Sequence, residues 1–186
     1  MAHAYDPYLK EILIDGDTLQ RRIVQLGEQI SADYQGVDSL KLICLLKGGV
    51  MFLTDLMRHI DVPHEIDFLA VSSYGRGSRQ ATGKVRIDMD LTSEVTDQHL
   101  LIVEDIIDSG YTLRFVMDVL RARHPASLKL VTLLDKPSRR QSAIAVDYTG
   151  FQIEDKFVFG YGLDLDEKFR NLPFIGVVRE DALRDE

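Results

Sequence analysis

The fold of this chain is decided by the stretch Leu100-Leu101-Ile102-Val103-Glu104-Asp105-Ile106-Ile107-Asp108-Ser109-Gly110-Tyr111-Thr112. Its apolar opening is typical of a strand buried on both faces, and His99–Ile107 is predicted to be that strand. Apolar residues then recur at helical spacing, which predicts a helix over Tyr111–His124. A strand that leads directly into a helix is the repeating unit of a parallel sheet covered by helices.

The same alternation of strands and helices extends along the rest of the chain. An amphipathic helix is predicted after Asp15, capped by Asp17 or Thr18 and ended near Gly36. A second helix is predicted over Val50–Ile60. Further strands are predicted over Leu40–Leu46, Ile66–Val71, Lys84–Asp90, Leu128–Leu134, Phe157–Tyr161 and Phe174–Val178. This order indicates an α/β fold in which a parallel twisted sheet is flanked by helices.

The composition indicates one soluble domain. The 186 residues suit a single domain, since a domain holds roughly 150 residues. Thirty acidic and 22 basic residues give a net charge of −8, which argues against a general nucleic-acid-binding protein. The single cysteine, Cys44, lies in an apolar run and is predicted to be a buried hydrophobic residue. Because no transmembrane run or secretory signal is visible, we expect a cytoplasmic protein with no membrane partner.

Polar loops follow three of the predicted buried strands. Ligands of parallel sheets bind beyond the carboxyl ends of the strands, which selects Lys47–Gly49, Glu104–Thr112 and Asp135–Lys136. The pair Glu104–Asp105 is one of five adjacent acidic pairs, about the number expected by chance, so its position at a strand end is what distinguishes it. The three loops are therefore the predicted site.

The residues that open the helix after Glu104–Asp105 suit an anion. Asp108-Ser109-Gly110-Tyr111-Thr112 supplies hydroxyl groups, a conformationally free glycine and the unpaired N–H groups of a helix start. The alternative is an ordinary turn in which Ser109 or Thr112 caps the helix. The chain has no Walker loop, no dinucleotide-binding glycine pattern and no zinc-ligand spacing. The residues alone leave two predictions open for this segment: a phosphate-binding helix start and an ordinary capped turn.

Four segments of the chain resemble the type I phosphoribosyltransferase family, in its bacterial hypoxanthine-guanine branch. Val103–Thr112 resembles the motif that binds phosphoribosyl pyrophosphate (PRPP), and Leu46–Gly49 resembles the pyrophosphate loop. Asp135–Lys136 resembles the segment with the purine-reading lysine, and Asp155–Pro173 resembles the purine hood and metal region. The resemblance implies one domain over residues 1–186, with a core at about 36–150 and a small hood formed by about 1–16 and 151–186.

The resemblance also implies a reaction in purine salvage, a glycosyl transfer that makes IMP or GMP. The 5-phosphoribosyl group passes from PRPP to hypoxanthine or guanine, and pyrophosphate leaves with the help of Mg²⁺. The implied PRPP-binding residues are Lys47, Gly48, Glu104, Asp105, Ser109, Gly110, Tyr111, Thr112 and Arg170. Glu104 and Asp105 would hold the ribose hydroxyl groups directly or through Mg²⁺, and Asp164 would bind the metal. The Leu46–Lys47 peptide is expected to be cis.

Asp108 is the implied catalytic residue, a general base or proton partner at purine N7. Lys136 would donate to the 6-oxo group, Phe157 would stack on the base and the Val158 backbone would read its edge. From the residues alone, Phe157 could instead be a core side chain.

The stretch Ser72–Gly83 has the composition of a loop and is long for a compact domain, so a flexible lid that carries Ser73 and Tyr74 is expected. Two positions depart from some relatives: Tyr111 stands where they have lysine, and Gly162 where they have alanine. The resemblance further implies a homodimer or homotetramer. A PRPP-sensing regulator on the same fold, or a transferase for xanthine or another base, remains the alternative function.

Overall fold

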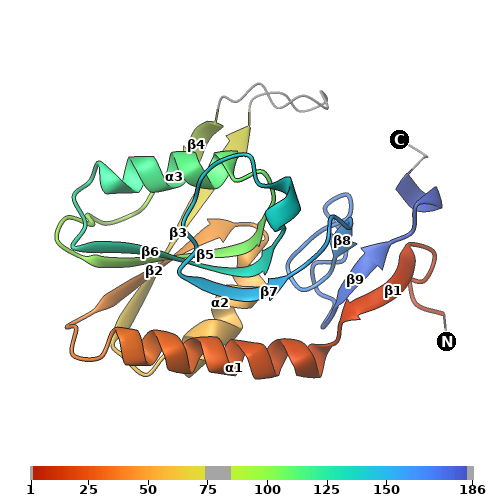
Figure 1. The fold of residues 1–186 in the computed structure, drawn as a ribbon, viewed down its shortest axis with the longest axis horizontal. Coiled ribbons are helices and arrows are strands. Elements are labelled where there is room, and N and C mark those ends of the chain that lie inside the picture. The colour runs from red at the N-terminus through yellow and green to blue at the C-terminus, as the bar shows by residue number, and fades with distance from the viewer. Residues whose placement is uncertain (1, 74–84, 184–186) are drawn as a thin grey trace.

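The structure is a computed structural model that describes residues 2–73 and 85–183. Its larger sheet has six strands in the order β4-β3-β2-β5-β6-β7 (Figure 1). These strands are β2 (Leu40–Leu46), β3 (His64–Ser73), β4 (Val85–Met89), β5 (His99–Ile107), β6 (Ser127–Asp135) and β7 (Tyr148–Gln152). The pairs β2–β3, β2–β5, β5–β6 and β6–β7 are parallel, whereas β4 is antiparallel to β3. The predicted parallel α/β sheet is confirmed.

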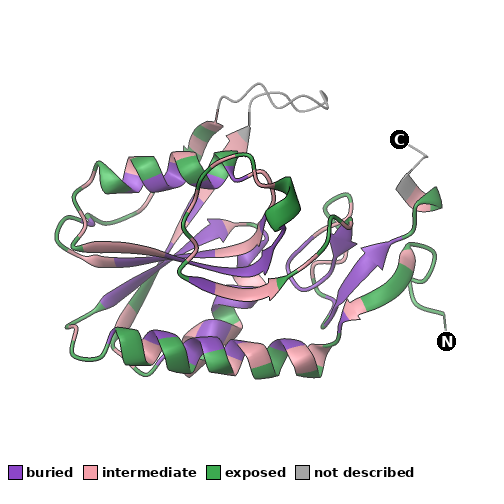
Figure 2. Cartoon of the chain, in the orientation of Figure 1, coloured by how far each residue is buried: buried purple, intermediate pink, exposed green. Residues whose placement is uncertain are grey.

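Helices cover both faces of this sheet. The helices are α1 (Gly16–Asp33), α2 (Gly49–Leu56) and α3 (Tyr111–Arg121), with short 3₁₀ turns η1 (Met57–His59), η2 (Pro137–Arg139) and η3 (Asp181–Leu183). In Figure 1, α1 and α2 lie on one side of the sheet and α3 on the other. Alternate residues of β2 enter two separate core clusters, Leu42 and Cys44 toward α1 and α2, Ile43 and Leu45 toward α3. This two-sided burial explains the apolar run Leu42–Leu46 within β2 (Figure 2).

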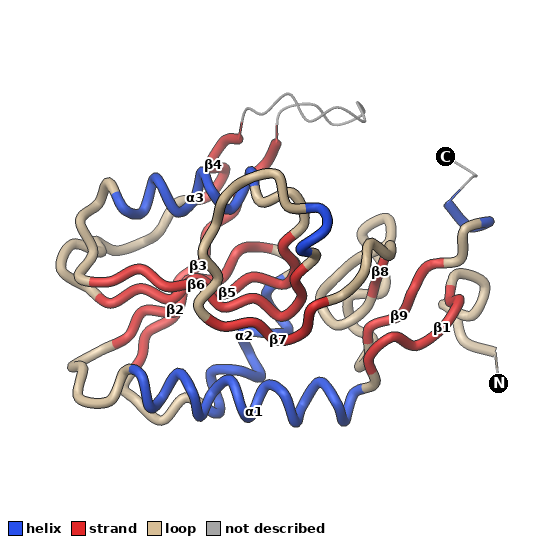
Figure 3. The backbone as a smooth tube through the Cα atoms, viewed as in Figure 1, coloured by secondary structure: helices blue, strands red, loops and turns tan. Residues whose placement is uncertain are grey.

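A second, three-stranded sheet brings the two ends of the chain together. Its antiparallel strands are β1 (Leu9–Ile14), β9 (Ile175–Val178) and β8 (Val158–Phe159), in the order β1-β9-β8 (Figure 3). The register pairs Leu9 with Val178 and Ile14 with Ile175. Residues of this sheet pack into the same core cluster as α1 and α2, so the two sheets share one apolar core.

Several local predictions need correction. The cap of α1 is Asp15 and not Asp17 or Thr18, because the helix begins at Gly16 and Asp15 Oδ1 accepts from Thr18 N at 2.8 Å. The strand predicted over 157–161 covers only Val158–Phe159, because the chain turns at Gly160 with φ +94°. Strands β1 and β7 were not predicted, and α3 ends at Arg121.

Two further features bear on the sequence predictions. Cys44 is fully buried and free, as predicted, and burial raises the pKa of its thiol to about 12, with the nearby carboxylates adding to the shift. Within residues 2–73 and 85–183, no helix is both long and apolar enough to span a membrane.

Candidate active site

The three predicted loops meet at one edge of the large sheet. They follow β2, β5 and β6, which are neighbours, so parallel pairing places their carboxyl ends side by side. Contact between the loops is close, since a Cβ atom on Gly48 would overlap Asp105 Oδ2. The backbone N–H of Lys136 donates to the carbonyl of Ile107 at 3.0 Å. The fold therefore brings together the residues that the sequence singled out from three separate segments.

Glu104 and Asp105 form a half-buried carboxylate pair near the end of β5. Burial, followed by the charge of Asp105, raises the pKa of Glu104 well above its usual value. Burial likewise raises the pKa of Asp105 to about 6, although hydrogen bonds from the backbone and the charge of Arg170 act in the opposite direction. Glu104 Oε2 is buried and has no hydrogen-bond partner among the described residues. A buried oxygen without a donor is costly to the free protein, and a ligand hydroxyl group or cation could supply what it lacks.

The start of α3 has no side-chain cap. Gly110 precedes the helix with φ +83°, and no side chain caps the first turn, so the predicted caps Ser109 and Thr112 are not used. The carbonyl of Ser109 accepts from the backbone N–H groups of Gln141 and Ser142 at 3.0 and 3.1 Å. A cavity of about 190 Å³ opens here, lined by Glu104, Ile106, Ile107, Asp108, Ser109, Gly110, Thr112 and Leu113. Because no side chain caps α3, the backbone N–H groups of its first turn could donate to an anionic ligand.

An ion pair connects the loop after β2 to the segment after β8. The Leu46–Lys47 peptide is cis, as the resemblance implied. Lys47 Nζ lies 2.8 Å from Glu167 Oε2, and Arg170 contacts both Glu167 at 3.3 Å and Asp164 at 2.9 Å. The hydrogen bonds from Lys47 and Arg170 hold the pKa of Glu167 below its usual value. Glu167 was missed from the sequence because an acidic run gives no sign of its distant partner.

A chain of charges lines the other side of the site. Lys136 is buried, and its Nζ lies 3.6 Å from Asp155 Oδ1. Arg139 Nε donates to Asp108 Oδ1 at 3.1 Å and lies 3.7 Å from Asp155 Oδ2. Asp155 and Arg139 were not predicted as site residues; the sequence signal was their closeness to Phe157 and to Lys136.

Two of the predicted base-binding residues lie in different environments. Phe157 is 52% exposed, so the alternative that it is a core side chain is wrong. Val158 is buried in β8 and pairs with Val177 of β9. An exposed aromatic ring that directly precedes a buried strand residue is free to stack on a planar ligand.

The predicted lid falls largely outside the described residues. Ser73 ends β3, where its backbone pairs with Val85, whereas Tyr74 and the rest of the stretch to Lys84 are not described.

The carboxylates of the site are able to take part in binding a cation together with a substrate. Among the described residues, no three His, Cys, Asp or Glu side chains are grouped to hold a metal by themselves. Mg²⁺ is usually held by one or two carboxylates plus substrate oxygens, for which Asp164, Glu104 and Asp105 supply the right hard donors. Asp164 uses Oδ1 for Arg170 and Oδ2 for the N–H of Glu167, but each carboxylate oxygen has a second lone pair.

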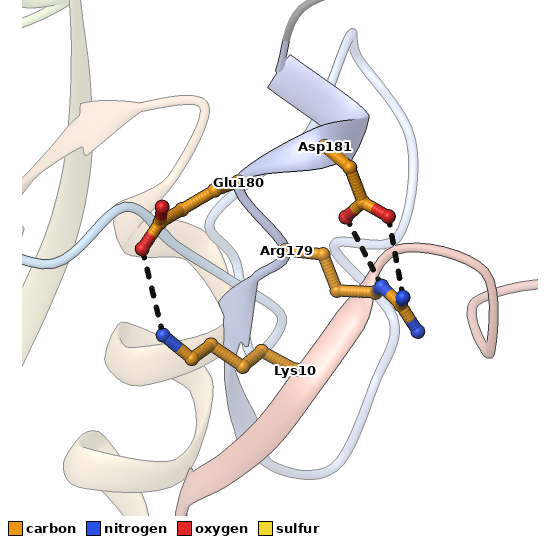
Figure 4. A pocket seen from close by; sticks show the side chains of 4 residues that line it. All are labelled: Lys10, Arg179, Glu180 and Asp181. Carbon is orange, nitrogen blue, oxygen red and sulfur yellow. Dashed lines mark hydrogen bonds and ion pairs between the residues drawn. The ribbon is translucent and has the colours of Figure 1, made fainter.

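A larger hollow on the small sheet lacks these features. It encloses about 510 Å³ and is lined by Lys10, Arg179, Glu180 and Asp181 (Figure 4). Its side chains pair with one another, Lys10 with Glu180 at 3.6 Å and Arg179 with Asp181 at 3.1 Å. These exposed ion pairs are typical of a solvated surface.

Comparison with known proteins places this geometry in a family. The profile of the phosphoribosyl transferase domain matches residues 13–168. The chain is 45% identical to a hypoxanthine-guanine phosphoribosyltransferase of Bacillus subtilis over 171 residues, which is 92% of this chain and 94% of that protein. It is also 46% identical to the bifunctional protein TilS/HprT of Listeria innocua, covering 93% of this chain but only 26% of that longer protein.

A solved structure agrees with the sequence comparison. The crystal structure of a hypoxanthine phosphoribosyltransferase from Staphylococcus aureus superimposes with a TM-score of 0.92 at 43% identity, and the match covers 98% of both chains. The fold, the strand-end site and these matches together show that the chain belongs to the hypoxanthine-guanine branch of the type I phosphoribosyltransferase family.

Proposed function

We propose that this protein transfers the 5-phosphoribosyl group of PRPP to hypoxanthine or guanine, which yields IMP or GMP and pyrophosphate. The observation that carries the proposal is the Glu104–Asp105 pair: Glu104 has a buried oxygen with no partner among the described residues, and it lines the same cavity as the start of α3. A sugar phosphate can satisfy both, since its hydroxyl groups donate and its phosphate accepts. In the reaction, the bond from ribose C1 to a pyrophosphate oxygen breaks, and base N9 bonds to C1. The proton lost from the imidazole ring of the base passes to Asp108.

The phosphate groups would be bound mainly by backbone N–H groups. Ser109, Gly110, Tyr111 and Thr112 surround the start of α3, and none of them carries a positive charge. On the pyrophosphate side, Lys47, Gly48 and Arg170 are proposed to bind the leaving group. Lys47 and Arg170 share Glu167 at 2.8 and 3.3 Å, so pyrophosphate would compete with this carboxylate for both cations.

The base would lie between Phe157 and the loops after β5 and β6. Lys136 has only donors, so it suits a 6-oxo group and disfavours a 6-amino group. Asp108 would accept at N7, Phe157 would stack on the ring, and the Val158 backbone would read the remaining edge.

Mg²⁺ is the proposed metal, held by Asp164 and by the Glu104–Asp105 pair together with PRPP oxygens. When bound, it would neutralise the charge that develops on the leaving pyrophosphate. Because Asp105 titrates near pH 6 in the free protein, binding of a cation there would release protons.

The remaining features of the sequence prediction are proposals as well. We infer that the small sheet and the segments near it form a hood over the base. A homodimer or homotetramer located in the cytoplasm is proposed from the family alone. Action on small molecules and not on nucleic acids fits the net charge of −8.

A panel of bases tests the proposal. The protein is mixed with PRPP and Mg²⁺ and, separately, with hypoxanthine, guanine, xanthine, adenine or uracil, and nucleotide formation is followed by ultraviolet absorbance. We expect turnover of hypoxanthine, guanine or both, and none of adenine. Turnover of xanthine or uracil alone would assign a different transferase. Binding of PRPP without turnover of any base, together with salt-dependent binding to RNA, would indicate a regulator instead.

A further inference from the structure

Four side chains of alternating charge form a continuous chain along the base side of the site. Lys136 Nζ lies 3.6 Å from Asp155 Oδ1, and Asp155 Oδ2 lies 3.7 Å from Arg139 Nε. Arg139 Nε in turn donates to Asp108 Oδ1 at 3.1 Å. The four residues come from the end of β6, the segment before β8, η2 and the loop after β5. Tertiary structure therefore connects the proposed donor for the 6-oxo group with the proposed acceptor at N7.

Each link constrains a group that would otherwise rotate. The lysine ammonium is a point charge on a flexible stem, and Asp155 draws the Nζ of Lys136 toward Arg139. Arg139 has only donors, so it can bind only an accepting oxygen of Asp108. It occupies Oδ1, and Oδ2 has no partner among the residues that the structure describes. The free oxygen is the one available to a base.

The 6-oxo group and N7 are adjacent on one edge of a purine. We propose that Arg139 and Asp155 are positioning residues that hold Asp108 and Lys136 at the spacing of these two groups, so that the site reads this edge of a 6-oxopurine as a unit. The inference rests on the proposed function and deepens it by naming the residues that set base specificity.

The two ion pairs of Arg139 contribute little to the stability of the fold. The side chains of Asp108, Arg139 and Asp155 are 47%, 50% and 52% exposed, and ion pairs at such exposure add little to stability. The hydrogen bond to Asp108, followed by the charges of Asp108 and Asp155, raises the pKa of Arg139, so both carboxylates act on this one guanidinium. Phe157, two residues after Asp155, is exposed on the same segment, so a base stacked there would lie beside the chain of charges.

Two bases that differ only at position 7 test the proposal. Hypoxanthine has both the 6-oxo group and N7, whereas 7-deazahypoxanthine keeps the 6-oxo group and has carbon in place of N7. The experiment measures kcat and KM for hypoxanthine and the inhibition constant of 7-deazahypoxanthine. It compares the full chain with Arg139→Gln, Asp155→Asn and, as a matched control, Arg121→Gln. Arg121 is 55% exposed and paired with Asp118 at 3.1 Å on α3, away from the site.

The two variants are expected to differ in a defined way. Arg139→Gln should lower kcat/KM for hypoxanthine about tenfold, since it removes one charge-assisted hydrogen bond, and should leave inhibition by 7-deazahypoxanthine within about twofold. Asp155→Asn should weaken the binding of hypoxanthine and of 7-deazahypoxanthine by a similar factor. The substitution releases Lys136, which is proposed to contact the 6-oxo group that both bases have. The KM for PRPP and the melting temperature should stay unchanged in Arg139→Gln and Asp155→Asn. In the control Arg121→Gln, all measured constants should stay unchanged.

Other outcomes overturn the proposal. Equal losses for the two bases in Arg139→Gln would show a general disturbance of the site, and no loss in either variant would show that the charges do not position the base. If the unaltered chain fails to use any 6-oxopurine, the proposed function itself is wrong, and this inference falls with it. Turnover by the unaltered chain with unchanged variants overturns the inference alone.

Discussion

At the scale of single residues, the site depends on carboxylates in unlike environments. Glu104 and Asp105 lie half-buried beside each other near the end of β5, and the partial loss of solvent around their carboxylates raises both pKa values. Asp108 lies three residues further along, half exposed and held by Arg139. One strand end therefore provides a carboxylate pair with raised pKa values and a separate, half-exposed carboxylate that is bound by an arginine.

The carboxylate pair is expected to destabilise the free protein at neutral pH. Because the folded pKa of Asp105, about 6, exceeds its reference value of 3.8, the folded state binds more protons, and its stability falls as pH rises from about 4 to above 6. Asp105→Asn should therefore raise the free energy of unfolding at pH 8 by about 1–2 kcal/mol, or roughly 2–6 °C in Tm.

Thermal melts without PRPP or Mg²⁺ at pH 8, 6 and 5 measure this effect. The gain should shrink toward pH 5, where much of the unaltered carboxyl is already protonated. The exposed Asp118→Asn serves as the control. An equal Tm for Asp105→Asn and the unaltered chain at pH 8 would contradict the argument.

Asp108 supplies the second prediction at this scale. Asp108→Asn keeps the shape of the side chain but removes the proton acceptor, so kcat should fall by about 10²-fold while the KM for PRPP changes little. Steady-state kinetics with hypoxanthine measures both constants. A variant with an unchanged kcat would remove Asp108 from proton transfer.

At the scale of elements, the loop after β2 and the loop after β8 approach each other closely at two glycines. Gly162, after β8, has φ +98°, and a Cβ atom there would overlap the carbonyl oxygen of Gly48 in the loop after β2. A Cβ on Gly48 would in turn overlap Asp105. The loop after β2 therefore approaches the Asp105 side chain and the backbone at Gly162 too closely to leave room for a Cβ atom at Gly48 or Gly162.

Gly162→Ala tests this packing. It should destabilise the protein by the cost of an unfavourable φ, about 1–2 kcal/mol, and should also push the Gly48 peptide and raise the KM for PRPP. Gly36→Ala is the matched control, since Gly36 has φ +86° and no atom within 4 Å of a new Cβ. We expect both variants to lower Tm and only Gly162→Ala to change the KM. If both leave the KM unchanged, the contact with Gly48 has no functional role.

At the scale of the whole molecule, the two sheets are joined by a shared core and by one buried tyrosine. Tyr161, after β8, is 4% exposed and donates its hydroxyl to Asp55 of α2, while Gln20 of α1 donates to Asp55 at 2.8 Å. Burial and the neighbouring Asp55 raise the pKa of Tyr161, so its hydroxyl stays protonated as a donor. The loop that carries Gly162, Asp164 and Arg170 is thereby attached to the helices beneath the large sheet.

Tyr161→Phe should distinguish the effect of the hydroxyl hydrogen bond to Asp55 from the effect of the packing of the ring. It keeps the ring and removes the hydrogen bond, which should cost about 1–2 kcal/mol of stability and raise the KM for PRPP through a looser loop. Tyr148→Phe is the control, since Tyr148 donates to Asp33 at 2.7 Å far from this loop. Both variants should melt earlier, and only Tyr161→Phe should bind PRPP less tightly. A KM that changes equally in both would contradict this role of Tyr161.

The sequence revealed the large sheet because its strands are buried on both faces. The run Leu42–Leu46 is continuous and apolar, Leu130–Leu134 is apolar except for Thr132, and the structure has strands there. Strand β1 was missed because three of its six residues are exposed, and it exists through pairing with β9 at the other end of the chain. Strand β7 was missed because Gly150 interrupts it; a Cβ there would overlap the carbonyl oxygen of Leu133 on β6.

The sequence by itself determined the types of the main elements and the chemistry of the strand-end loops. Local burial sets apolar periodicity, and polar residues that follow a buried strand must emerge at its end. Only the tertiary structure decided which groups meet: Lys47 with Glu167, Gly48 with Asp105, and Asp155 with both Lys136 and Arg139. Such contacts join segments up to 120 residues apart. The same holds for the raised pKa values of Glu104 and Asp105, because burial and neighbouring charges belong to the folded chain and not to any short stretch of it.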